Sequence, residues 1–588
     1  MAAAKDNWNQ LAIAPLSGLL DTRSRPADLS PGVFRYKLNL SVNRTGGLCV
    51  QTGFHALDLG PRSDNPALTR NWDFHRRNLP VRDAVNFLYE STATDGVRHL
   101  FAGTASTLHV MDNGTSEWTA LVTGLTDARW MAGTVGDVTS FTSGLVGGLY
   151  YVNLVTLAIT TGFTGAPFSQ ARVIIPFAGF NLAMNVLEGA NLKPSRVFWS
   201  DFQVGNDFTP PGPTVSGFQD LDYGDPILNA VEMMGALYIF TTRAIWRCAT
   251  NPSTDPATPS FLFQRIYSEP ENQTGCLVYP NTLVTTGREL YWWSHDSIWT
   301  FNPYIVTPES ADWLLRGSGA VFSDDNPDRT ENRCCETIIG KYRPLTREIR
   351  YSYPQDTGSA TPVCINNREL VLNTEYRTMH LSDAGFSAYC NFRQTPGLED
   401  DCNSGQVFIG ASTTDYCLKS FESVYSREFA SLVGGSRTTD ISDANYATTL
   451  SGYYCRIAGL APFGYPNREK VVRELLLDHE IKPNSLASPN LITLRIGNHI
   501  NLVDPMSLEA RCSPAWHSQD SLPLTCPDEA TIAAMLADNR RPSDPLSWTL
   551  WETGCKIYFD LRITSATGTA PMEHNACFSA FRFDVMLV

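Results

Sequence analysis

Short alternating runs of hydrophobic and polar residues recur along most of the chain. Runs such as Leu237–Trp246 and Leu290–Phe301 are rich in aromatic and β-branched residues and end at Gly, Asp, Asn or Pro. This pattern is typical of strands joined by tight turns. In the second run, a turn at His295–Ser297 is expected to return the chain, so that a hairpin buries every other side chain against a neighbouring sheet. Repeated hairpins of this kind indicate the blades of a β-propeller.

Regular hairpins are clearest between residues 85 and 135. There, Asp95–Gly96 and Asn113–Gly114 separate alternating runs, and these dipeptides are the strongest short-range hairpin signals. Further units are expected at 138–160, 171–200, 227–250, 261–302, 335–381 and 386–425. Their spacing of roughly 30 to 50 residues is typical of propellers, but no strict sequence repeat marks the blades. The pattern therefore predicts a propeller and leaves the number of blades open.

The pattern changes after residue 430, where a run of Gly, Ser, Thr and Asp residues reads as a linker. Four later runs alternate like strands of a sandwich: 471–481, 491–496, 556–563 and 578–588. A short amphipathic helix is expected at 528–539. The sequence predicts a mainly β protein with four parts: an N-terminal arm (1–35), a β-propeller platform (36–430), a linker or closing segment (431–455) and a C-terminal β-sandwich-like domain (456–588).

Composition narrows the class of protein. Of 588 residues, 43% are hydrophobic and only 18% are charged, which indicates a folded chain. The formal net charge of -15 disfavours tight binding to a phosphate backbone, because that affinity comes from Lys and Arg. The polar start of the chain, Met1–Gln10, shows no apolar core of an export signal, so we expect folding in a cytoplasm.

Two other features could indicate a membrane span and a set of metal-binding or disulfide-bonded cysteines, but the sequence favours neither. The uncharged stretch from Val138 to Ala171 is long enough to tempt a membrane span, but its glycines, threonines and alternation fit paired strands better. The 14 cysteines follow no zinc spacing, and Cys334 and Cys335 are adjacent. We expect reduced, mostly buried thiols that act as small hydrophobic groups.

Enzymatic motifs are missing from the sequence. It contains no G-x-S-x-G, no phosphate-binding glycine loop and no H-E-x-x-H, since His479–Glu480 runs into Lys482–Pro483. We therefore predict that the protein is not an enzyme and assign no catalytic, cofactor-binding or metal-ligating residue.

Two acidic groups and three tryptophans could instead form a functional site. The acidic groups are Asp220, Asp222 and Asp225, and then Asp324, Asp325, Asn326 and Asp328. Such oxygens could hold calcium, or act as acid and base on a glycan, but Asp is also common in turns, which we favour here. Trp292, Trp293 and Trp299 could form a sugar platform, although such residues in hairpins more often pack between blades.

The order of motifs in the central region resembles the tail nozzle proteins of short-tailed bacteriophages. An opening with a basic turn, glycine and an aromatic, at residues 43–54, is similar to phage tail propeller proteins. The motifs then follow in this order: Trp199–Asp201, Gly224–Ile227, Tyr238–Trp246, Gly275–Cys276, Leu290–Phe301 and Asn366–Tyr376. The resemblance covers about residues 35 to 430, and it rests on the order of the motifs.

The resemblance implies a structural role in the virion tail, with assembly in the host cytoplasm. It implies a sixfold ring of copies below the portal and adaptor, contacts with tail fibres or spikes, and transient, non-specific passage of DNA through a central channel. A carboxylate-lined lumen would repel phosphates at contact distance, while salt screens that repulsion beyond about 10 Å. No membrane span and no cofactor are expected.

Two alternatives stay open at this stage. The first is a carbohydrate-binding or carbohydrate-cleaving propeller that acts on host-surface glycans, for which Asp222 and Asp225 are the carboxylates to substitute. The second is a receptor-binding propeller of a cellular organism, which the missing export signal disfavours.

Overall fold

The computed structural model describes most of residues 84–302 and 330–420, together with the strands of residues 9–13, 36–56 and 454–587. This part of the chain is almost entirely β, with only short 3-10 helices. The predicted fold class, a β-propeller with a further β-rich domain, is confirmed.

Six blades of the propeller are separate antiparallel sheets. Blade 1 holds β6 (Val85–Thr92), β7 (Arg98–Thr104), β8 (Leu108–Met111) and β9 (Trp118–Val122). Blade 2 holds β10 (Met131–Val135), β11 (Val138–Thr142), β12 (Leu149–Asn153) and β13 (Ile159–Thr161). Blade 3 holds β14 (Gln170–Phe177), β15 (Phe180–Glu188), β16 (Asn191–Trp199) and β17 (Gly217–Asp220). Blade 4 holds β18 (Ile227–Met233), β19 (Ala236–Thr241), β20 (Ala244–Thr250) and β21 (Phe261–Ser268).

The remaining blades differ from this four-stranded pattern. Among the described residues, blade 5 has three strands, β22 (Val284–Thr285), β23 (Leu290–Trp293) and β24 (Ile298–Phe301). Blade 6 holds β25 (Ile339–Arg343), β26 (Glu348–Tyr353), β27 (Arg368–Asn373) and β28 (Thr378–Ser382), and it is the first part of a nine-stranded sheet. Blade 7 holds β29 (Phe386–Arg393), β30 (Gln406–Ser412), β31 (Leu418–Ser420) and, from the N-terminal region, β5 (His55–Ala56).

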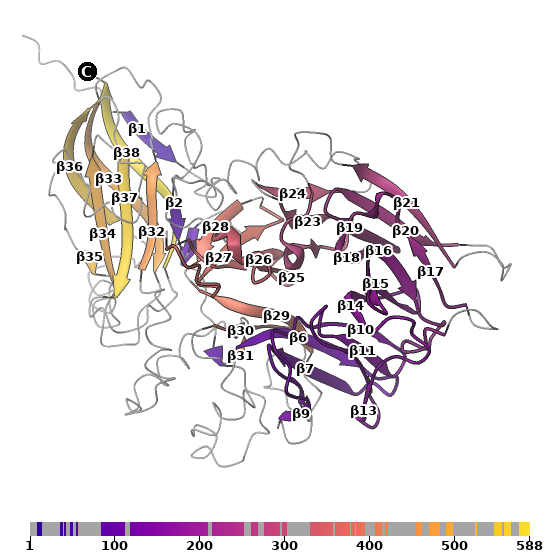
Figure 1. Cartoon of the computed structure of the whole chain (residues 1–588). Helices are drawn as coiled ribbons and strands as arrows, with labels where there is room; N and C mark the ends of the chain where they lie inside the picture. The colour runs from indigo at the N-terminus through magenta and orange to yellow at the C-terminus, as the bar shows by residue number, and fades with distance from the viewer. Residues whose placement is uncertain are drawn as a thin grey trace, which may run out of the picture.

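The blades form a closed ring. Each innermost strand contacts the next one, in the order β6, β10, β14, β18, β22, β25 and β29, and β29 contacts β6 again. Figure 1 looks into this ring and shows the inner strands around a common centre. Because β5 pairs with β31 as the outer strand of blade 7, the N-terminal region helps to hold the last blade.

Most of the expected hairpin units lie within single blades, with one error. The unit expected at 261–302 is wrong, because β21 pairs with β20 and completes blade 4. The stretch considered for a membrane span forms β11 to β13 and the start of β14. In the described part of the chain, no helix has the length and hydrophobicity needed to cross a membrane.

Two tight hairpins depend on positive backbone φ angles. Ala178 and Gly179 join β14 to β15 with φ of 52° and 84°, and Met234 and Gly235 join β18 to β19 with φ of 53° and 73°. Two consecutive positive φ values match the twist of antiparallel strands, and glycine adopts them without a steric penalty. The glycine at the second position therefore fixes each turn.

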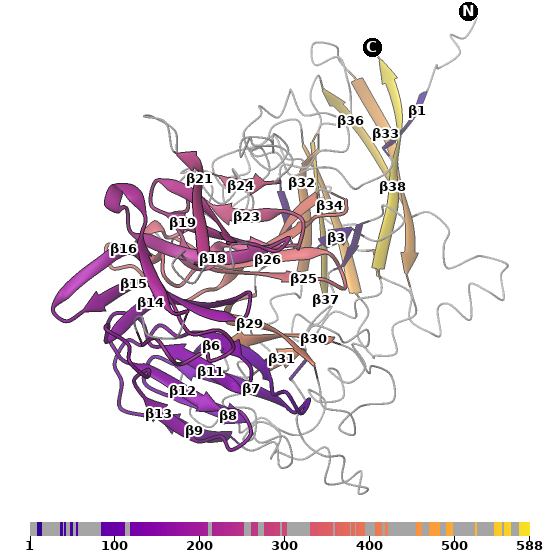
Figure 2. The same ribbon diagram turned by 90° about the vertical axis from the view of Figure 1, so that its right-hand side faces the viewer.

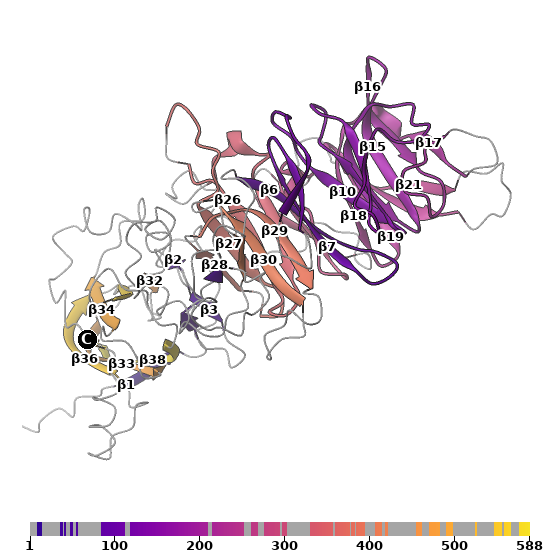
Figure 3. The same cartoon turned by 90° about the horizontal axis from the view of Figure 1, so that it is seen from below.

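The C-terminal strands form a second β region beside the propeller (Figures 1 and 2). One sheet has the order β3 (Leu40–Val42), β4 (Leu48–Val50), β38 (Ala576–Leu587), β33 (Lys470–Ile481) and β36 (Leu546–Gly554), with β1 (Asn9–Ile13) also on β38. The other continues from blade 6 through β2 (Tyr36–Leu38), β32 (Tyr454–Leu460), β37 (Tyr558–Ser565), β34 (Asn490–Gly497) and β35 (Leu524–Thr525). Figure 3 shows β1, β33, β34, β36 and β38 grouped apart from the blades, whereas β2 and β3 lie near β28.

One short strand connects the two parts. β2 pairs in parallel with β28 of blade 6 and antiparallel with β32. Strands within residues 36–56, a stretch that the sequence analysis assigned to the propeller, thus pair with both regions. The expected helix at 528–539 and residues 431–453 of the expected linker lie outside the described residues.

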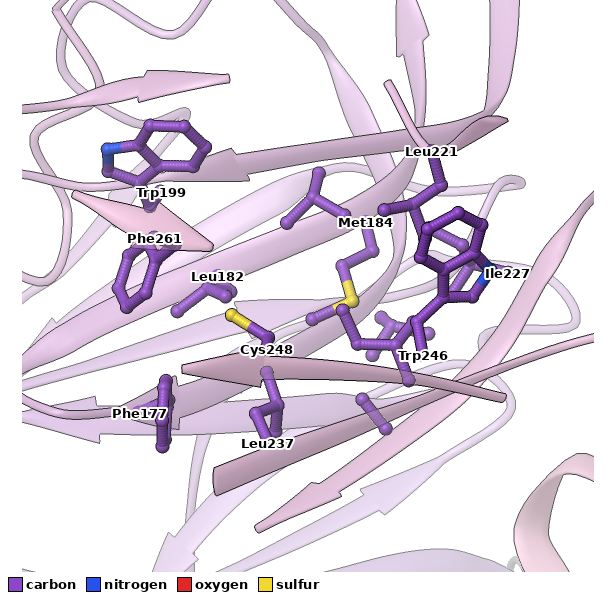
Figure 4. Close-up of a cluster of buried hydrophobic side chains, with 14 of the residues drawn as sticks. Phe177, Leu182, Met184, Trp199, Leu221, Ile227, Leu237, Trp246, Cys248 and Phe261 are labelled. Atoms are coloured by element: carbon purple, nitrogen blue, oxygen red, sulfur yellow. The ribbon is translucent and has the colours of Figure 1, made fainter. Parts of the chain in front are cut away.

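A hydrophobic cluster fills each of the seven junctions between blades. Figure 4 shows the cluster between blades 3 and 4, where Trp199, Trp246 and Phe261 pack around aliphatic side chains. Among the described residues, this cluster contains 16 buried residues, whereas the one between blades 6 and 7 contains four. Burial of apolar surface stabilises the ring by about 25 cal/mol per Å², so the junction between blades 6 and 7 gains least from it.

Candidate functional site

Hydrogen bonds from side chains cross every junction of the ring. In each case a Ser, Thr or Asn side chain donates to a backbone carbonyl at or just before the first strand of the next blade. The seven pairs, from blade 7 to blade 1 onward, are Ser387 to Val85, Asn86 to Ala128, Thr142 to Ala171, Asn185 to Ile227, Asn229 to Pro280, Asn281 to Glu336 and Asn366 to Phe386. We call these bonds the interblade latches.

Charged side chains from separate blades meet near the ring axis. Arg172 on β14 of blade 3 donates to Glu336, which precedes β25 of blade 6, across 2.7 Å. Blades 3 and 6 are not neighbours in the ring, so this ion pair spans its centre. The backbone carbonyl of Glu336 also accepts the latch from Asn281 at 2.9 Å.

The thiol of Cys335 lies beside this ion pair. Burial raises its pKa, as does the negative charge of Glu336, while Arg172 and Arg129 oppose the shift. A raised pKa keeps the thiol protonated at neutral pH, and a protonated thiol is a poor nucleophile.

The first acidic group does not converge on one point. Asp220 ends β17 and accepts two bonds of 2.6 Å from Arg196, which also donates to Glu188 at 2.6 Å. The bonds to Arg196 hold the pKa of Asp220 below its usual range. Asp222 begins the short helix η2 (Asp222–Gly224), and Asp225 caps its C-terminal end.

This geometry fits the turn interpretation of the acidic residues. Among the described residues, no group of three or more His, Cys, Asp or Glu side chains is arranged to hold a metal ion. The second acidic group, at residues 324–328, lies outside the described residues.

The tryptophans of blade 5 pack between blades. Trp292 contacts Phe240 of blade 4 with ring centroids 5.0 Å apart. Trp293, on the opposite face of β23, contacts Tyr351 and Tyr353 of blade 6 at 5.2 and 5.6 Å. Both indoles are fully buried, and Trp299 packs against the cluster between blades 4 and 5. Trp292 and Trp293 therefore offer no surface to a sugar.

A buried ionic network lies between blades 6 and 7. Arg350 donates to Glu369 at 2.8 Å and lies 3.6 Å from Glu348. The hydroxyl of Tyr389, on blade 7, donates to the other oxygen of Glu369. Burial raises the pKa of Glu369 even though Arg350 opposes the shift. Because Arg350 and Glu369 are 2% and 0% exposed, their charges are almost completely desolvated.

Because side chains alternate along β26, blade 6 has an apolar face toward blade 5 and a polar, charged face toward blade 7. On β26, Ile349, Tyr351 and Tyr353 point into the apolar cluster shared with blade 5. The intervening residues Glu348, Arg350 and Ser352 are also buried and belong to the opposite face, toward blade 7. The sequence analysis did not predict this network. The charged residues Glu348 and Arg350, which alternate with apolar residues within the strand 348–353, could have indicated it.

The expectation that the cysteines are reduced is wrong for one pair. Cys334 and Cys364 form a disulfide, with Cα atoms 5.2 Å apart. Cys248, Cys335 and Cys390 are free thiols, and Cys276 is buried. Burial raises the pKa of Cys248 to about 12, so at this position the expected small hydrophobic role holds.

Comparison with known proteins does not identify a relative. No protein-family model matches the chain, and no curated protein is significantly similar to it. Among solved structures, apo AztD from Citrobacter koseri matches with a TM-score of 0.31 and 9% identity, over 56% of this chain and 84% of that chain. This likeness is too weak to support a functional conclusion.

Proposed function

We propose that this chain is a structural component of a bacteriophage tail, a ring-forming nozzle subunit below the portal and adaptor that surrounds the path of DNA ejection. The proposal starts from the order of motifs in the sequence. It implies a homo-oligomeric ring, with sixfold symmetry suggested by the resemblance alone, and contacts with the adaptor and with fibres or spikes.

One observation supports a mechanical role more than any other. The nine-stranded sheet runs from blade 6 through β2 into the C-terminal strands. Backbone hydrogen bonds therefore join the two regions, which restricts their relative motion more than a flexible linker would. A subunit of a tail must transmit force without changing shape, and a continuous sheet suits that task.

The latches add to this rigidity. Each one fixes the start of a blade to its predecessor, so that separating any two blades breaks a directional bond as well as apolar contacts. The ion pair of Arg172 and Glu336 occupies the region of the propeller axis. In this proposal DNA passes between copies of the chain, and not along the axis of one propeller.

The acidic composition fits passage of DNA without adhesion. The chain has 60 Asp and Glu residues against 45 Lys and Arg residues, and this net charge of -15 opposes the phosphate contacts that release counterions. Copies arranged around a lumen would present this excess of carboxylates to the DNA. Binding of duplex DNA by the assembled ring should accordingly be weak even at low salt.

The test is assembly. The purified protein, alone and mixed with its virion's portal and adaptor, is measured by light scattering and negative-stain microscopy. Rings with a central hole, formed alone or on the adaptor, support the proposal. A persistent monomer that ignores the portal complex contradicts it, and a glycan-binding assay with Asp222→Asn and Asp225→Asn would then test the carbohydrate alternative.

A further inference from the structure

The junction between blades 6 and 7 differs from the other six in what holds it together. Its apolar cluster has four buried residues among those described, and buried charges take the place of further apolar contacts. Buried ion pairs contribute little net stability, because desolvation offsets their attraction. The latch at this junction therefore carries a larger share of the cohesion than its counterparts do.

That latch is built differently from the rest. The amide nitrogen of Asn366 donates to two backbone carbonyls, those of Phe386 on β29 and of Thr337 before β25, both at 2.8 Å. Asn366, which lies just before the third strand of blade 6, thus ties the start of blade 6 to the start of blade 7. Thr413, which follows β30, also donates to the carbonyl of Asn366 at 2.7 Å.

The disulfide tethers this latch on two sides. Cys364 lies two residues before Asn366, and Cys334 lies three residues before Thr337, the acceptor. Oxidation of the pair therefore fixes the donor segment and the acceptor segment to each other. Without the bond, residues 359–365 are attached only through the chain and through contacts of the loop, such as the bonds from Arg333 to the carbonyls of Ser359 and Ala360.

The two sulfurs differ in access. Cys334 is buried at 3% exposure, whereas Cys364 is exposed. Its neighbours Val363 and Ile365 are 53% and 55% exposed, so the loop around Cys364 faces solvent. Thiol–disulfide exchange requires access of the attacking thiolate to one sulfur, and of the two cysteines Cys364 is the exposed one.

We propose that Cys334 and Cys364 form a redox modification site that controls the junction between blades 6 and 7. A low-molecular-weight thiolate attacks the sulfur of Cys364, the S–S bond breaks, and Cys334 leaves as a thiolate that takes up a proton. A second thiol molecule then attacks the mixed disulfide and releases Cys364, so that two thiols are oxidised to one small disulfide. A low-molecular-weight disulfide reverses both steps.

The reduced protein has a loosened latch and a junction that opens more often, while the oxidised protein has a locked ring. Reducing cytoplasm favours the first state and an oxidising exterior the second. This device does not depend on the proposed role in a phage tail, because it follows from the position of the disulfide within the propeller.

Hydrogen exchange followed by mass spectrometry tests the proposal on the full chain. Peptides that cover 366–373 and 386–393 report on this junction, and peptides from β15 and β18 report on the junction between blades 3 and 4. Loss of two hydrogen bonds, each worth about 1 kcal/mol, predicts exchange that is on the order of 10- to 100-fold faster at the first junction after treatment with dithiothreitol. The second junction should not change.

Variants separate this disulfide from other effects of the reductant. Cys334→Ser/Cys364→Ser should exchange fast with or without dithiothreitol, and Cys335→Ser, the matched control, should respond as the unmodified protein does. Equal exchange in the oxidised and reduced protein overturns the proposal, as does a full response that persists in the double variant. If the double variant does not fold, Asn366→Ala with the disulfide intact should reproduce the fast exchange, and its failure to do so contradicts the role of the latch.

Discussion

Removing the charge of Arg350 tests how the ionic network contributes to stability. In Arg350→Met the side chain keeps much of its volume, but Glu369, which is 0% exposed, loses its cationic partner. Breaking a buried pair by removing one member costs about 3–5 kcal/mol, because the remaining charge stays desolvated. We expect a loss of this size in the free energy of unfolding at pH 8.

The loss should depend on pH in a defined direction. Burial already raises the pKa of Glu369, and removing Arg350 takes away the charge that opposes the shift. The folded variant then holds a proton that the unfolded chain, with a pKa near about 4.3, releases. Because the folded state binds more protons between these two pKa values, stability falls as pH rises through that window and is largest below it. The destabilisation should therefore be smaller at pH 5 than at pH 8.

The assay is urea unfolding followed by tryptophan fluorescence at both pH values. Arg347→Met is the matched control, since Arg347 and Glu375 form an ion pair of 3.0 Å whose side chains are 59% and 41% exposed. Exposed pairs contribute about 0–1 kcal/mol. Glu369→Gln combined with Arg350→Met should recover much of the loss. If Arg350→Met costs no more than Arg347→Met, or equally much at both pH values, the reasoning about desolvation is refuted.

Two substitutions and one thiol-labelling experiment test the packing, the latches and the burial of the cysteines. Trp293→Ala should cost about 3–5 kcal/mol in urea unfolding, because it leaves a cavity between blades 5 and 6. An unchanged midpoint would contradict that packing. Asn86→Ala should cost about 1–3 kcal/mol by leaving the buried carbonyl of Ala128 without the latch, whereas a neutral effect would show that water replaces it. Iodoacetamide at pH 8 should label the half-buried Cys335 well before Cys248, whose pKa burial raises to about 12, with peptide mass spectrometry as the readout; equal labelling rates would contradict the burial.

The strands and hairpins could be predicted from the sequence, because they depend on the pattern of neighbouring residues. Alternation in Leu237–Trp246 and Leu290–Phe301 gave strands at nearly the observed positions, because burial of alternate side chains is visible in the residues themselves. The packing of Trp292 and Trp293 between blades was also favoured correctly. The same alternation predicted four C-terminal strands, which correspond to β33, β34, β37 and β38, but it did not predict β32, β35 or β36.

The pairing of strands and cysteines that lie far apart in the chain could not be predicted from this pattern. β2 has three residues, and its Leu38 pairs with Leu381 on one side and Arg456 on the other. Nothing in so short a run indicates partners that lie hundreds of residues away. The disulfide of Cys334 and Cys364 posed the same problem, because the fold brings the two sulfurs together across a separation of 30 residues.

The latches explain how seven blades can repeat in structure without repeating in sequence. Their acceptors are backbone carbonyls, which every residue type supplies, so the acceptor position leaves no trace in the sequence. Their donors are Ser, Thr or Asn, and they stand on the first strand in Asn86, on the second in Asn185 and before the third in Asn366. A sequence motif requires the same residue type at the same position in each blade. Here the donor differs in both residue type and position, and only the fact that each junction is bridged is shared. What repeats from blade to blade is therefore the hydrogen bond across each junction, and not a residue motif. Of this repeat, the sequence shows only the alternation of hydrophobic and polar residues within each strand.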